Sequence, residues 1–321
     1  MKAIFYDTYG PPEVLQLKKL EKPIPKPKQI LIKIKAAAIT MGDCEMRSPK
    51  IPNFTWFIVR LFFGIRKPKK RILGSYWAGE VAQTGQDVDT FKEGDKLFGI
   101  SEGFGAHAEY LCLLASGALT SMPNEATYEE VAPMGLGLDS LHFLKKARIK
   151  AGDNILINGA GGGIGTYAVQ LAKCFGAMVT AVDSADKLEM LTAVGADKVI
   201  DYKAGDFSKL GTSYDLVFDV VGALSYRQSM RLLNKKGRYI TAVPLISGLL
   251  KGLWARLTSK KRIMTGLTRA NKEELDFLKK MMEEGKLKTV IDKRFSIDEV
   301  PDAHNYIEQG HKRGNVVMVV D

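Results

Sequence analysis

One stretch of this sequence, Asn154–Asp183, restricts the fold more than any other. It opens with the apolar run Ile155–Ile157, which is typical of a short strand buried on both faces of a sheet. Four of the six residues in Ala160–Gly165 are glycine, and apolar residues at helical spacing follow them. A second apolar run then ends at Asp183. Strand, glycine turn, helix, strand and acidic residue stand in the order of a dinucleotide-binding βαβ unit.

The glycine turn indicates where a phosphate would bind. The N–H groups and the positive dipole end at a helix start attract a pyrophosphate, and glycine allows the backbone to come close to it. We therefore predict that the turn binds the cofactor through six consecutive residues: Ala160, Gly161, Gly162, Gly163, Ile164 and Gly165. The strict G-x-G-x-x-G pattern fails at its first position, Ala160, so the prediction rests on the strand–turn–helix context. The alternative is a tight turn without a ligand, but such a turn would not need four glycines, which lose the most backbone entropy on folding.

Asp183 bears on the choice of nucleotide. It lies 18 residues after Gly165, near the spacing of about 20 residues at which an acid binds the ribose 2′-hydroxyl. The same carboxylate would repel a 2′-phosphate. Taken by itself, Asp183 therefore favours NAD(H) over NADP(H).

Composition limits the classes of protein that remain. The 321-residue chain has room for about two domains, and its hydrophobic content of 45% is ordinary for a globular protein. The net charge of +11 fits a solvated lysine-rich surface, a polyanionic cofactor, nucleic acid or a membrane surface. No basic segment with interleaved aromatic residues indicates RNA binding, so we expect no nucleic-acid partner. Three well-separated cysteines and a start without the apolar core of a signal peptide lead us to expect a cytoplasmic protein.

The chain divides into two parts with different secondary-structure patterns. Residues 1–122 contain short alternating segments such as LIKIKAA, separated by glycine and charge clusters, which predicts a small, partly open β-barrel. From residue 123, strands alternate with helices, which predicts a doubly wound parallel sheet of the α/β class. The tail returns to strand, helix and strand, and Val316–Val320 is expected to re-enter the first domain. We therefore predict one domain from 1–122 plus 267–321 and a second from 123–266.

The segment Asn53–Arg71 interrupts the β pattern with an apolar and aromatic run that ends in a basic cluster. Its apolar part is far shorter than the roughly 20 residues that a membrane span requires, so we expect no stable membrane insertion. Three interpretations stay open: a helix packed on the barrel, an apolar wall beside the substrate, or a weak interfacial contact through the basic end.

Six segments carry a resemblance to a known family. They are RILGSYWAGEV, FKEGDKLFG, FGAHAEYL, INGAGGGIGTYAVQLAK, VGADKVIDY and YDLVFDVVG, in that order along nearly the whole chain. The chain resembles the zinc-free quinone oxidoreductase branch of the medium-chain dehydrogenase/reductase superfamily. The resemblance implies a GroES-like catalytic domain, a Rossmann domain, an active site in the cleft separating them, and a homodimer joined through an edge of the Rossmann sheets.

The resemblance also bears on zinc. In the zinc-dependent relatives a cysteine, a histidine and a later cysteine hold the catalytic metal, and the matching positions here are Thr40, Ser75 and Gly135. This set lacks the thiolates and imidazoles that zinc prefers. The structural zinc lobe needs four clustered cysteines, and the chain has three. We therefore expect no zinc.

Another group must then polarise the substrate carbonyl. Related quinone reductases carry N-x-x-D-x-x-x-R, and the matching residues here are Thr40, Asp43 and Arg47, so the first position departs from the motif. The Thr40 hydroxyl can donate one hydrogen bond, and the Tyr76 phenol is a second candidate donor. The alternative for Asp43 and Arg47 is a structural ion pair that holds the loop.

By resemblance, further residues lie against the cofactor. Those matched to a 2′-phosphate contact are Lys187 and Tyr202, and those matched to the nicotinamide-side ribose are Val221, Gly222 and Val243. Lys187 is equally well explained as a solvated lysine at a helix start. Asp139 departs from the usual threonine, and a carboxylate beside phosphates is unfavourable unless it is paired or turned away. The choice between NADP(H) and NAD(H) therefore stays open.

Three hypotheses follow. The first is a zinc-independent, NAD(P)H-dependent reductase of quinones or α,β-unsaturated carbonyls that works by hydride transfer. The second is a zinc-free alcohol or aldehyde dehydrogenase, for which one hydroxyl gives little polarisation of an unactivated carbonyl. The third is a nucleotide-gated binder of RNA or membrane surfaces without catalysis.

Overall fold

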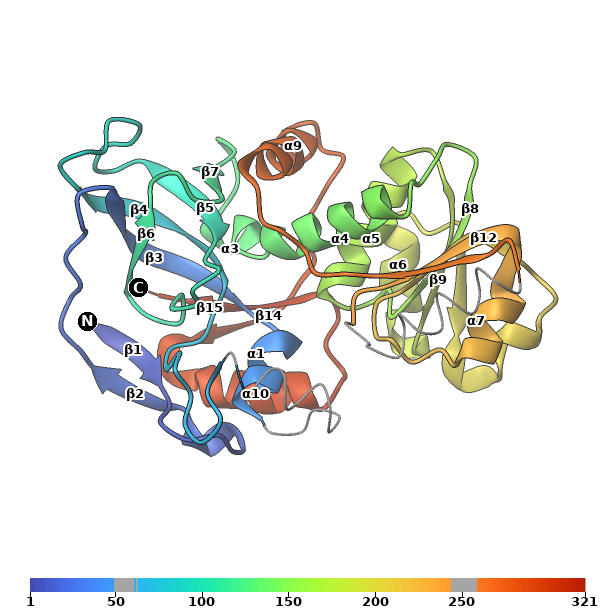
Figure 1. The fold of residues 1–321 in the computed structure, drawn as a ribbon, viewed down its shortest axis with the longest axis horizontal. Helices are drawn as coiled ribbons and strands as arrows, with labels where there is room; N and C mark the ends of the chain where they lie inside the picture. The colour runs from blue at the N-terminus through green and yellow to red at the C-terminus, as the bar shows by residue number, and fades with distance from the viewer. Residues whose placement is uncertain (49–60, 62, 244–258, 321) are drawn as a thin grey trace. The chain divides into compact units, whose positions relative to one another are not determined.

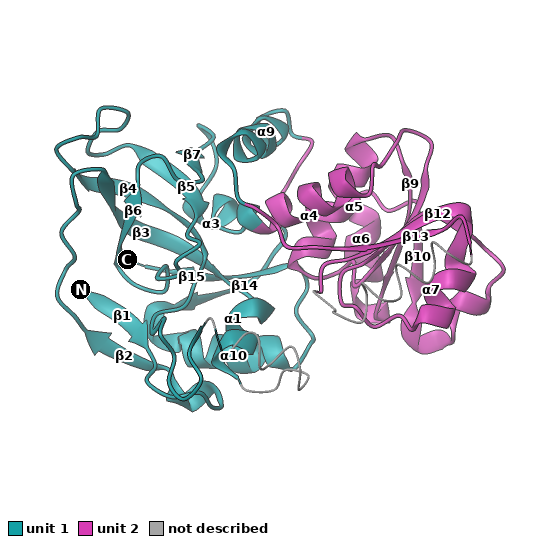
Figure 2. Ribbon diagram, viewed as in Figure 1, with its two compact units in different colours: residues 1–135, 270–285, 289–321 teal, residues 136–269, 286–288 magenta. Residues whose placement is uncertain are grey.

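The computed structural model describes residues 1–48, 61, 63–243 and 259–320. Most of the apolar run in Asn53–Arg71 thus lies outside the described residues, and its three interpretations stay predictions. The chain forms two compact units (Figure 2). Unit 1 comprises residues 1–135, 270–285 and 289–321, and unit 2 comprises residues 136–269 and 286–288.

Unit 1 is built on a seven-stranded sheet with the order β14-β15-β3-β4-β5-β7, in which β6 also pairs with β3 (Figure 1). A separate hairpin pairs β1 with β2. The strands are β1 (Lys2–Phe5), β2 (Gln16–Lys19), β3 (Gln29–Ile39), β4 (Tyr76–Thr84), β5 (Lys96–Ile100), β6 (Tyr110–Leu114), β7 (Leu119–Ser121), β14 (Ile291–Ser296) and β15 (Asn315–Val319). The helices are α1 (Met41–Arg47), α3 (Tyr128–Val131), α9 (Lys272–Glu283) and α10 (Val300–Glu308).

The central strand β3 shows why this sheet forms. Its alternating sequence buries Ile30, Ile32 and Ile34 in one core cluster, while Lys33 and Lys35 stay partly exposed. The predicted return of the chain end is confirmed, because β15 pairs antiparallel with β3 and its Val316 joins the same core. Residues from both ends of the sequence therefore make one hydrophobic core.

Unit 2 holds a six-stranded sheet in which every neighbouring pair is parallel. Its order is β10-β9-β8-β11-β12-β13, which becomes 3-2-1-4-5-6 when the strands are counted within the unit. This is the order of a doubly wound dinucleotide-binding sheet, so the predicted fold class is confirmed. The strands are β8 (Asn154–Asn158), β9 (Met178–Asp183), β10 (Lys198–Asp201), β11 (Tyr214–Asp219), β12 (Leu233–Thr241) and β13 (Arg262–Thr265), and the helices are α4 (Met134–Lys146), α5 (Gly163–Cys174), α6 (Leu188–Ala193) and α7 (Tyr226–Leu232).

Some elements differ from the sequence-based expectation. The sequence predicts that Tyr128–Ala147 is largely helical, and this segment forms two helices, α3 and α4, because Pro133 has no N–H to continue the hydrogen-bond ladder. The three-residue strand β7 was not predicted, since it is too short to show a period. Unit 1 also extends to residue 135, beyond the boundary at 122 expected from the pattern, and Tyr128 of α3 donates a hydrogen bond to Glu80 of β4 at 2.6 Å.

Among the described residues, none of the helices has both the length and the apolar character that a membrane crossing would require.

Candidate functional site

The six predicted turn residues lie at the carboxyl end of β8, where α5 begins with Gly162 as its N-cap. A methyl group on Gly165 would come within 2.3 Å of the Gly159 carbonyl oxygen and 2.5 Å of the Ala160 carbonyl oxygen. Glycine is therefore required there for the helix to pack against the turn. The strand order reverses between β8 and β11, and ligands of open parallel sheets bind at the carboxyl edge beside such a reversal.

Asp183 ends β9 and lies beneath this turn. One carboxylate oxygen accepts the Gly161 N–H at 2.7 Å, and the other accepts the Ser184 N–H at 2.9 Å. Lys187 forms a salt bridge with the second oxygen at 3.0 Å, and the two side chains are only 9% and 8% exposed. A Cβ at Gly161 would lie 2.6 Å from the Lys187 side chain, so the pair fills the space beside the turn. The alternative of a solvated lysine is wrong, because Lys187 is buried and paired.

The other predicted cofactor residues occupy the same edge of the sheet. Val221 follows β11, and its methyl group would lie 2.6 Å from a Cβ on Gly159. Gly222 has φ +66°, and a Cβ there would come within 3.0 Å of Val243, which follows β12. The structure thus brings together the turn after β8 and the segments after β11 and β12. Tyr202 follows β10 and is 49% exposed.

Helix α4 connects to the turn through Ser140, whose buried hydroxyl donates to the Ile164 carbonyl at 2.7 Å. Asp139, the neighbouring residue, is partly buried. Whether it lowers activity stays a prediction.

The candidate catalytic residues lie in unit 1, around the start of α1. Thr40 is the N-cap, and its hydroxyl donates to the Asp43 carboxylate at 2.6 Å. The same carboxylate oxygen accepts the Thr40 N–H at 2.9 Å, and the other accepts the Gly74 N–H at 3.0 Å. Asp43 is buried, so this capping box ties the helix start to the Gly74 loop. The Thr40 hydroxyl proton is bound to Asp43 and does not point to a substrate oxygen in this arrangement.

Arg47 is fully buried and connects α1 to α10. Its guanidinium pairs with Glu308, donates to the Gly10 carbonyl at 2.5 Å and lies 3.4 Å from His304 Nδ1. Burial, followed by the neighbouring His107 and Arg47, holds the pKa of His304 well below its usual value, so the ring stays neutral beside the guanidinium. The structural interpretation of Arg47 therefore fits, but with Glu308 rather than Asp43 as the ion-pair partner.

Tyr76 is the first residue of β4 and is partly buried. A Cβ on Gly135 would lie 2.0 Å from its ring, so the phenol packs directly on the Gly135 backbone. This contact bears on zinc. Of the three positions matched to zinc ligands, Gly135 has no side chain and no room for one, and the Thr40 hydroxyl is bound to Asp43.

The residues present do not fit a catalytic zinc. Tetrahedral zinc sites use thiolate, imidazole or carboxylate ligands, and Thr40, Ser75 and Gly135 supply none of these. Within the described part of the chain, no group of three or more histidine, cysteine or acidic side chains could hold a metal ion. No step of the chemistry is therefore assigned to zinc.

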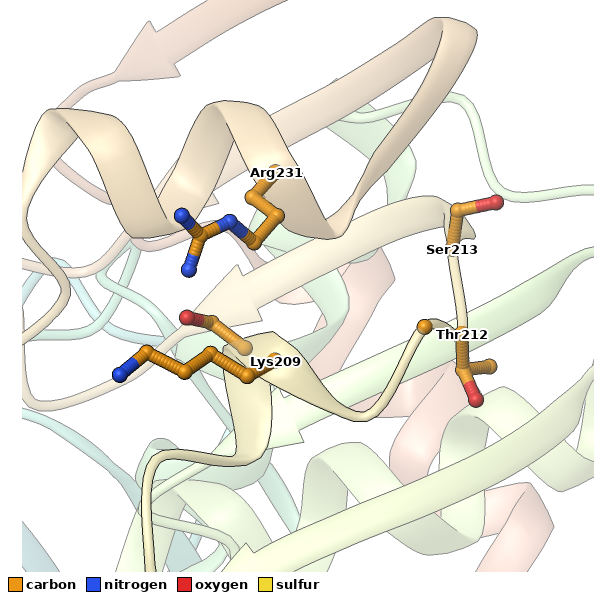
Figure 3. Close-up of a pocket in the computed structure, with 6 residues that line it drawn as sticks. Lys209, Thr212, Ser213 and Arg231 are labelled. Carbon is orange, nitrogen blue, oxygen red and sulfur yellow. The ribbon is translucent and has the colours of Figure 1, made fainter.

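A surface pocket of about 400 Å³ lies elsewhere in unit 2. Its lining residues are Ser208, Lys209, Gly211, Thr212, Ser213 and Arg231, and Figure 3 shows the Lys209 and Arg231 side chains on one side of it. Ser213 precedes β11, and Arg231 is in the last turn of α7 before β12. The pocket therefore opens at the amino ends of these strands, opposite the glycine turn, and is not the nucleotide site.

One buried residue at this edge was missed from the sequence. Asp219 ends β11 and accepts hydrogen bonds from the loop that carries Val221 and Gly222. The available signal was an acidic residue at the end of a buried strand, the same signal that identified Asp183.

Known proteins share both units of this chain. The family model described as the alcohol dehydrogenase GroES-like domain matches residues 26–130, and the model described as zinc-binding dehydrogenase matches residues 194–318. The chain is 36% identical to a chloroplastic quinone-oxidoreductase of Triphysaria versicolor, over 99% of this chain and 98% of the relative. It is 33% identical to a 2-methylene-furan-3-one reductase of Solanum lycopersicum, over 99% of this chain and 79% of the relative.

A solved structure agrees with these relatives. The quinone oxidoreductase of Coxiella burnetii superposes with a TM-score of 0.88 at 32% identity, over 100% of this chain and 99% of that one. The chain therefore belongs to the quinone oxidoreductase branch of the medium-chain dehydrogenase/reductase superfamily. The resemblance inferred from the six sequence segments is confirmed.

Proposed function

We propose that this protein reduces quinones or α,β-unsaturated carbonyls with NADH or NADPH, without zinc. One observation carries the proposal: the glycine turn lies at the carboxyl edge of β8, beside the reversal of strand order, in a chain of the quinone oxidoreductase branch. The turn presents the N-terminus of a 12-residue helix, which suits a pyrophosphate.

A conjugated substrate fits the groups that this chain offers. When bound at the glycine turn, a reduced nicotinamide would supply a hydride to the substrate, and a proton from water or a hydroxyl would complete the reduction. In a conjugated substrate the developing negative charge would rest on an oxygen, so a single hydrogen-bond donor of this chain would give useful stabilisation. An unactivated alcohol or ketone requires more polarisation, which makes the dehydrogenase alternative less favourable.

We assign the role of that donor to Tyr76 rather than Thr40. The Thr40 hydroxyl donates to Asp43 and caps α1, whereas Tyr76 is a partly buried phenol on β4. Tyr76→Phe should lower kcat for a quinone and change the melting temperature less than Thr40→Val does. Thr40→Val should mainly lower the melting temperature, because it removes the cap. The opposite pattern would return the role to Thr40.

The Asp183–Lys187 pair supports a preference for NADPH. Asp183 already accepts two backbone N–H groups, and Lys187 offsets its charge. If Lys187 turned toward a 2′-phosphate, Asp183 would keep both backbone donors. The pair thus removes much of the repulsion that an isolated Asp183 would exert on NADPH.

The decisive experiment combines binding with a substrate comparison. Calorimetric titrations with NADPH and NADH test the turn, and parallel assays with 1,4-naphthoquinone, an enone and a simple alcohol test the reaction. We expect nucleotide binding and reduction of the first two substrates. Failure of both nucleotides to bind, or faster turnover of the alcohol, would contradict the proposal.

We also propose a homodimer, as the family resemblance implies. The sheet of unit 2 ends in the edge strands β10 and β13, and an edge strand offers N–H and C=O groups for pairing with another chain. Sedimentation velocity at several concentrations tests this directly. A monomer at micromolar concentration would contradict it.

A cytoplasmic location is proposed on the basis of the thiols. Cys44, Cys112 and Cys174 form no disulfide among the described residues, as is typical of a reducing compartment. Cell fractionation with a tagged chain tests the location. Recovery from an oxidising compartment would rule it out.

A further inference from the structure

Asp219 is a fully buried carboxylate at the end of β11, at the centre of the proposed cofactor edge. A buried charge is strongly unfavourable unless hydrogen bonds satisfy it. One oxygen accepts from Asn158 Nδ2 at 2.9 Å and from the Gly222 N–H at 3.0 Å. The other accepts from the Leu224 N–H at 2.9 Å and from the Tyr239 hydroxyl at 2.8 Å. Four donors thus surround this one side chain.

The four donors come from two neighbouring strands and from the loop after β11 itself. Asn158 is the last residue of β8, Tyr239 lies in β12, and the two backbone donors belong to the loop after β11. Burial and then the negative charge of Asp219 raise the pKa of Tyr239, so its hydroxyl keeps its proton and remains a donor. Asp219 therefore joins the strand that carries the glycine turn to the two strands that follow it in the sheet.

The loop held in this way lies against Gly159, the residue before the glycine turn. Gly222 adopts the left-handed conformation, with φ +66°, so that its N–H can point back to Asp219. The preceding Val221 packs against Gly159, where a Cβ would lie 2.6 Å from its methyl group. Val221 is 54% exposed and so presents an apolar face beside the turn. The loop that places Val221 against Gly159 is thus the loop whose N–H groups donate to Asp219.

We propose that Asp219 is a positioning residue. It holds the Val221–Gly222 loop in the position that aligns the nicotinamide half of the cofactor for hydride transfer. The proposal rests on the proposed reductase function and adds a residue to it. Asp219 contacts the loop and not the reacting atoms, so its effect is on alignment. Small misplacements of reacting groups slow a reaction strongly.

Asp219→Asn is the sharpest test because it keeps the shape and changes one oxygen to NH₂. Asn158 and Tyr239 can each reorient to accept a hydrogen bond from that NH₂. The backbone N–H groups of Gly222 and Leu224 cannot reorient. Whichever way the new amide points, either the Gly222 N–H or the Leu224 N–H loses its acceptor. We therefore expect the loop to shift.

The readouts separate alignment from stability. ADP is the adenosine diphosphate half of the cofactor without nicotinamide, and its dissociation constant reports on the glycine turn and on the ribose site at Asp183. Single-turnover oxidation of NADPH by 1,4-naphthoquinone reports on hydride transfer. For Asp219→Asn we expect the hydride-transfer rate to fall roughly 10- to 100-fold, with ADP binding within about twofold of the wild type. An unchanged hydride-transfer rate, or an equal loss of ADP binding, would overturn the proposal.

Two milder variants keep the test valid if Asp219→Asn does not fold. Tyr239→Phe and Asn158→Ala each remove one side-chain donor and leave both backbone hydrogen bonds to Asp219 in place. We expect each to slow single-turnover hydride transfer by a smaller factor and the double variant to slow it further. Wild-type rates in the folded double variant would contradict the inference. If the wild type itself bound no nucleotide, the proposed function would fail instead, so the two failures are distinguishable.

Discussion

Two buried carboxylates, Asp183 in unit 2 and Asp43 in unit 1, were both predicted to belong to the functional site, and their surroundings differ. Asp183 accepts a backbone N–H of the glycine turn and pairs with a buried cation, Lys187. Asp43 accepts two backbone N–H groups and the Thr40 hydroxyl within a helix cap. The first lies at a sheet edge where several cofactor candidates converge, and the second closes a local turn. Sequence spacing located both carboxylates, and their partners differ: Asp183 accepts from the glycine turn, and Asp43 caps a helix.

The largest effect is expected from closing the glycine turn. In Gly165→Ala the new methyl group would lie 2.3 to 2.6 Å from backbone atoms of Gly159 and Ala160, which cannot move without opening the turn. We expect loss of NADPH and NADH binding, together with about 1–3 kcal/mol of destabilisation from overpacking. Calorimetric titration and thermal unfolding measure the two effects.

The matched control for this change is Gly103→Ala, because the nearest atom to its Cβ, on Lys70, would be 3.7 Å away. This variant should bind nucleotide as the wild type does. Normal nucleotide binding by Gly165→Ala would mean that the turn is not the cofactor site, and the contrast between the two units would fail.

The next effect concerns Arg47 and tests whether unit 1 uses this residue for structure or for catalysis. Arg47→Met keeps the length of the side chain and removes the ion pair to Glu308 and the hydrogen bond to Gly10. Removing one partner of a buried pair costs about 3–5 kcal/mol, and partial exposure of Glu308 reduces this to roughly 2–3 kcal/mol. Urea unfolding should show the loss.

The kinetic counterpart decides between the two roles of Arg47. Well below the new melting temperature, Arg47→Met should reduce 1,4-naphthoquinone with a kcat close to that of the wild type. A stable variant with a strongly reduced kcat would restore Arg47 as a catalytic residue.

These contrasts show what the sequence could predict. The strand before the glycine turn and the helix after it follow from local patterns; β8 has nearly the expected bounds, and α5 begins at Gly163, three residues earlier than expected. The cap formed by Thr40 and Asp43 is also local, and its three-residue spacing resembles a capping box as much as a catalytic motif. Local sequence patterns predict the backbone conformation of a short segment well, because that conformation depends mainly on residues close by in the sequence.

Long-range partners could not be predicted in this way. Arg47 meets Glu308 across 261 residues of sequence, and Asp219 meets Asn158 across 61. No periodicity links such positions, because the fold alone brings them together. The spacing of Asp43 and Arg47 on one short helix suggested a local ion pair. In the fold, the Arg47 guanidinium instead contacts Glu308 of α10 and the Gly10 carbonyl.

A smaller effect on cofactor binding is expected at Lys187, and it tests whether the Asp183–Lys187 pair selects the nucleotide. Lys187→Gln leaves the hydrogen bonds from Gly161 and Ser184 to Asp183 in place but removes the cation. If Lys187 binds a 2′-phosphate, the KM for NADPH should rise about 10- to 100-fold, the range of a charged hydrogen bond, while the KM for NADH stays constant. Steady-state kinetics with both nucleotides measure the ratio.

Asp183→Asn is the matched control for this ratio. It removes the negative charge and keeps one oxygen, which can still accept the Gly161 N–H while the Ser184 N–H loses its acceptor, so the affinity for NADPH relative to NADH should not fall. Equal increases in KM for both nucleotides in Lys187→Gln would show that the pair supports the turn and does not select the nucleotide.

The smallest effect is a pH dependence at His304, next to Arg47. Burial lowers the pKa of His304 in the folded state below the unfolded value of about 6.5, so the unfolded state binds more protons as the pH falls through this value. Stability should therefore decrease from pH 7 toward pH 5, by at most about 1.4 kcal/mol per pH unit for one proton. The groups facing the ring are Arg47 and His107, and the Cys44 thiol contacts the His304 backbone carbonyl. His304→Gln carries no titrating group, so its unfolding free energy should change less over this pH range. Equal slopes for the two proteins would show that protonation of His304 does not limit the stability of unit 1.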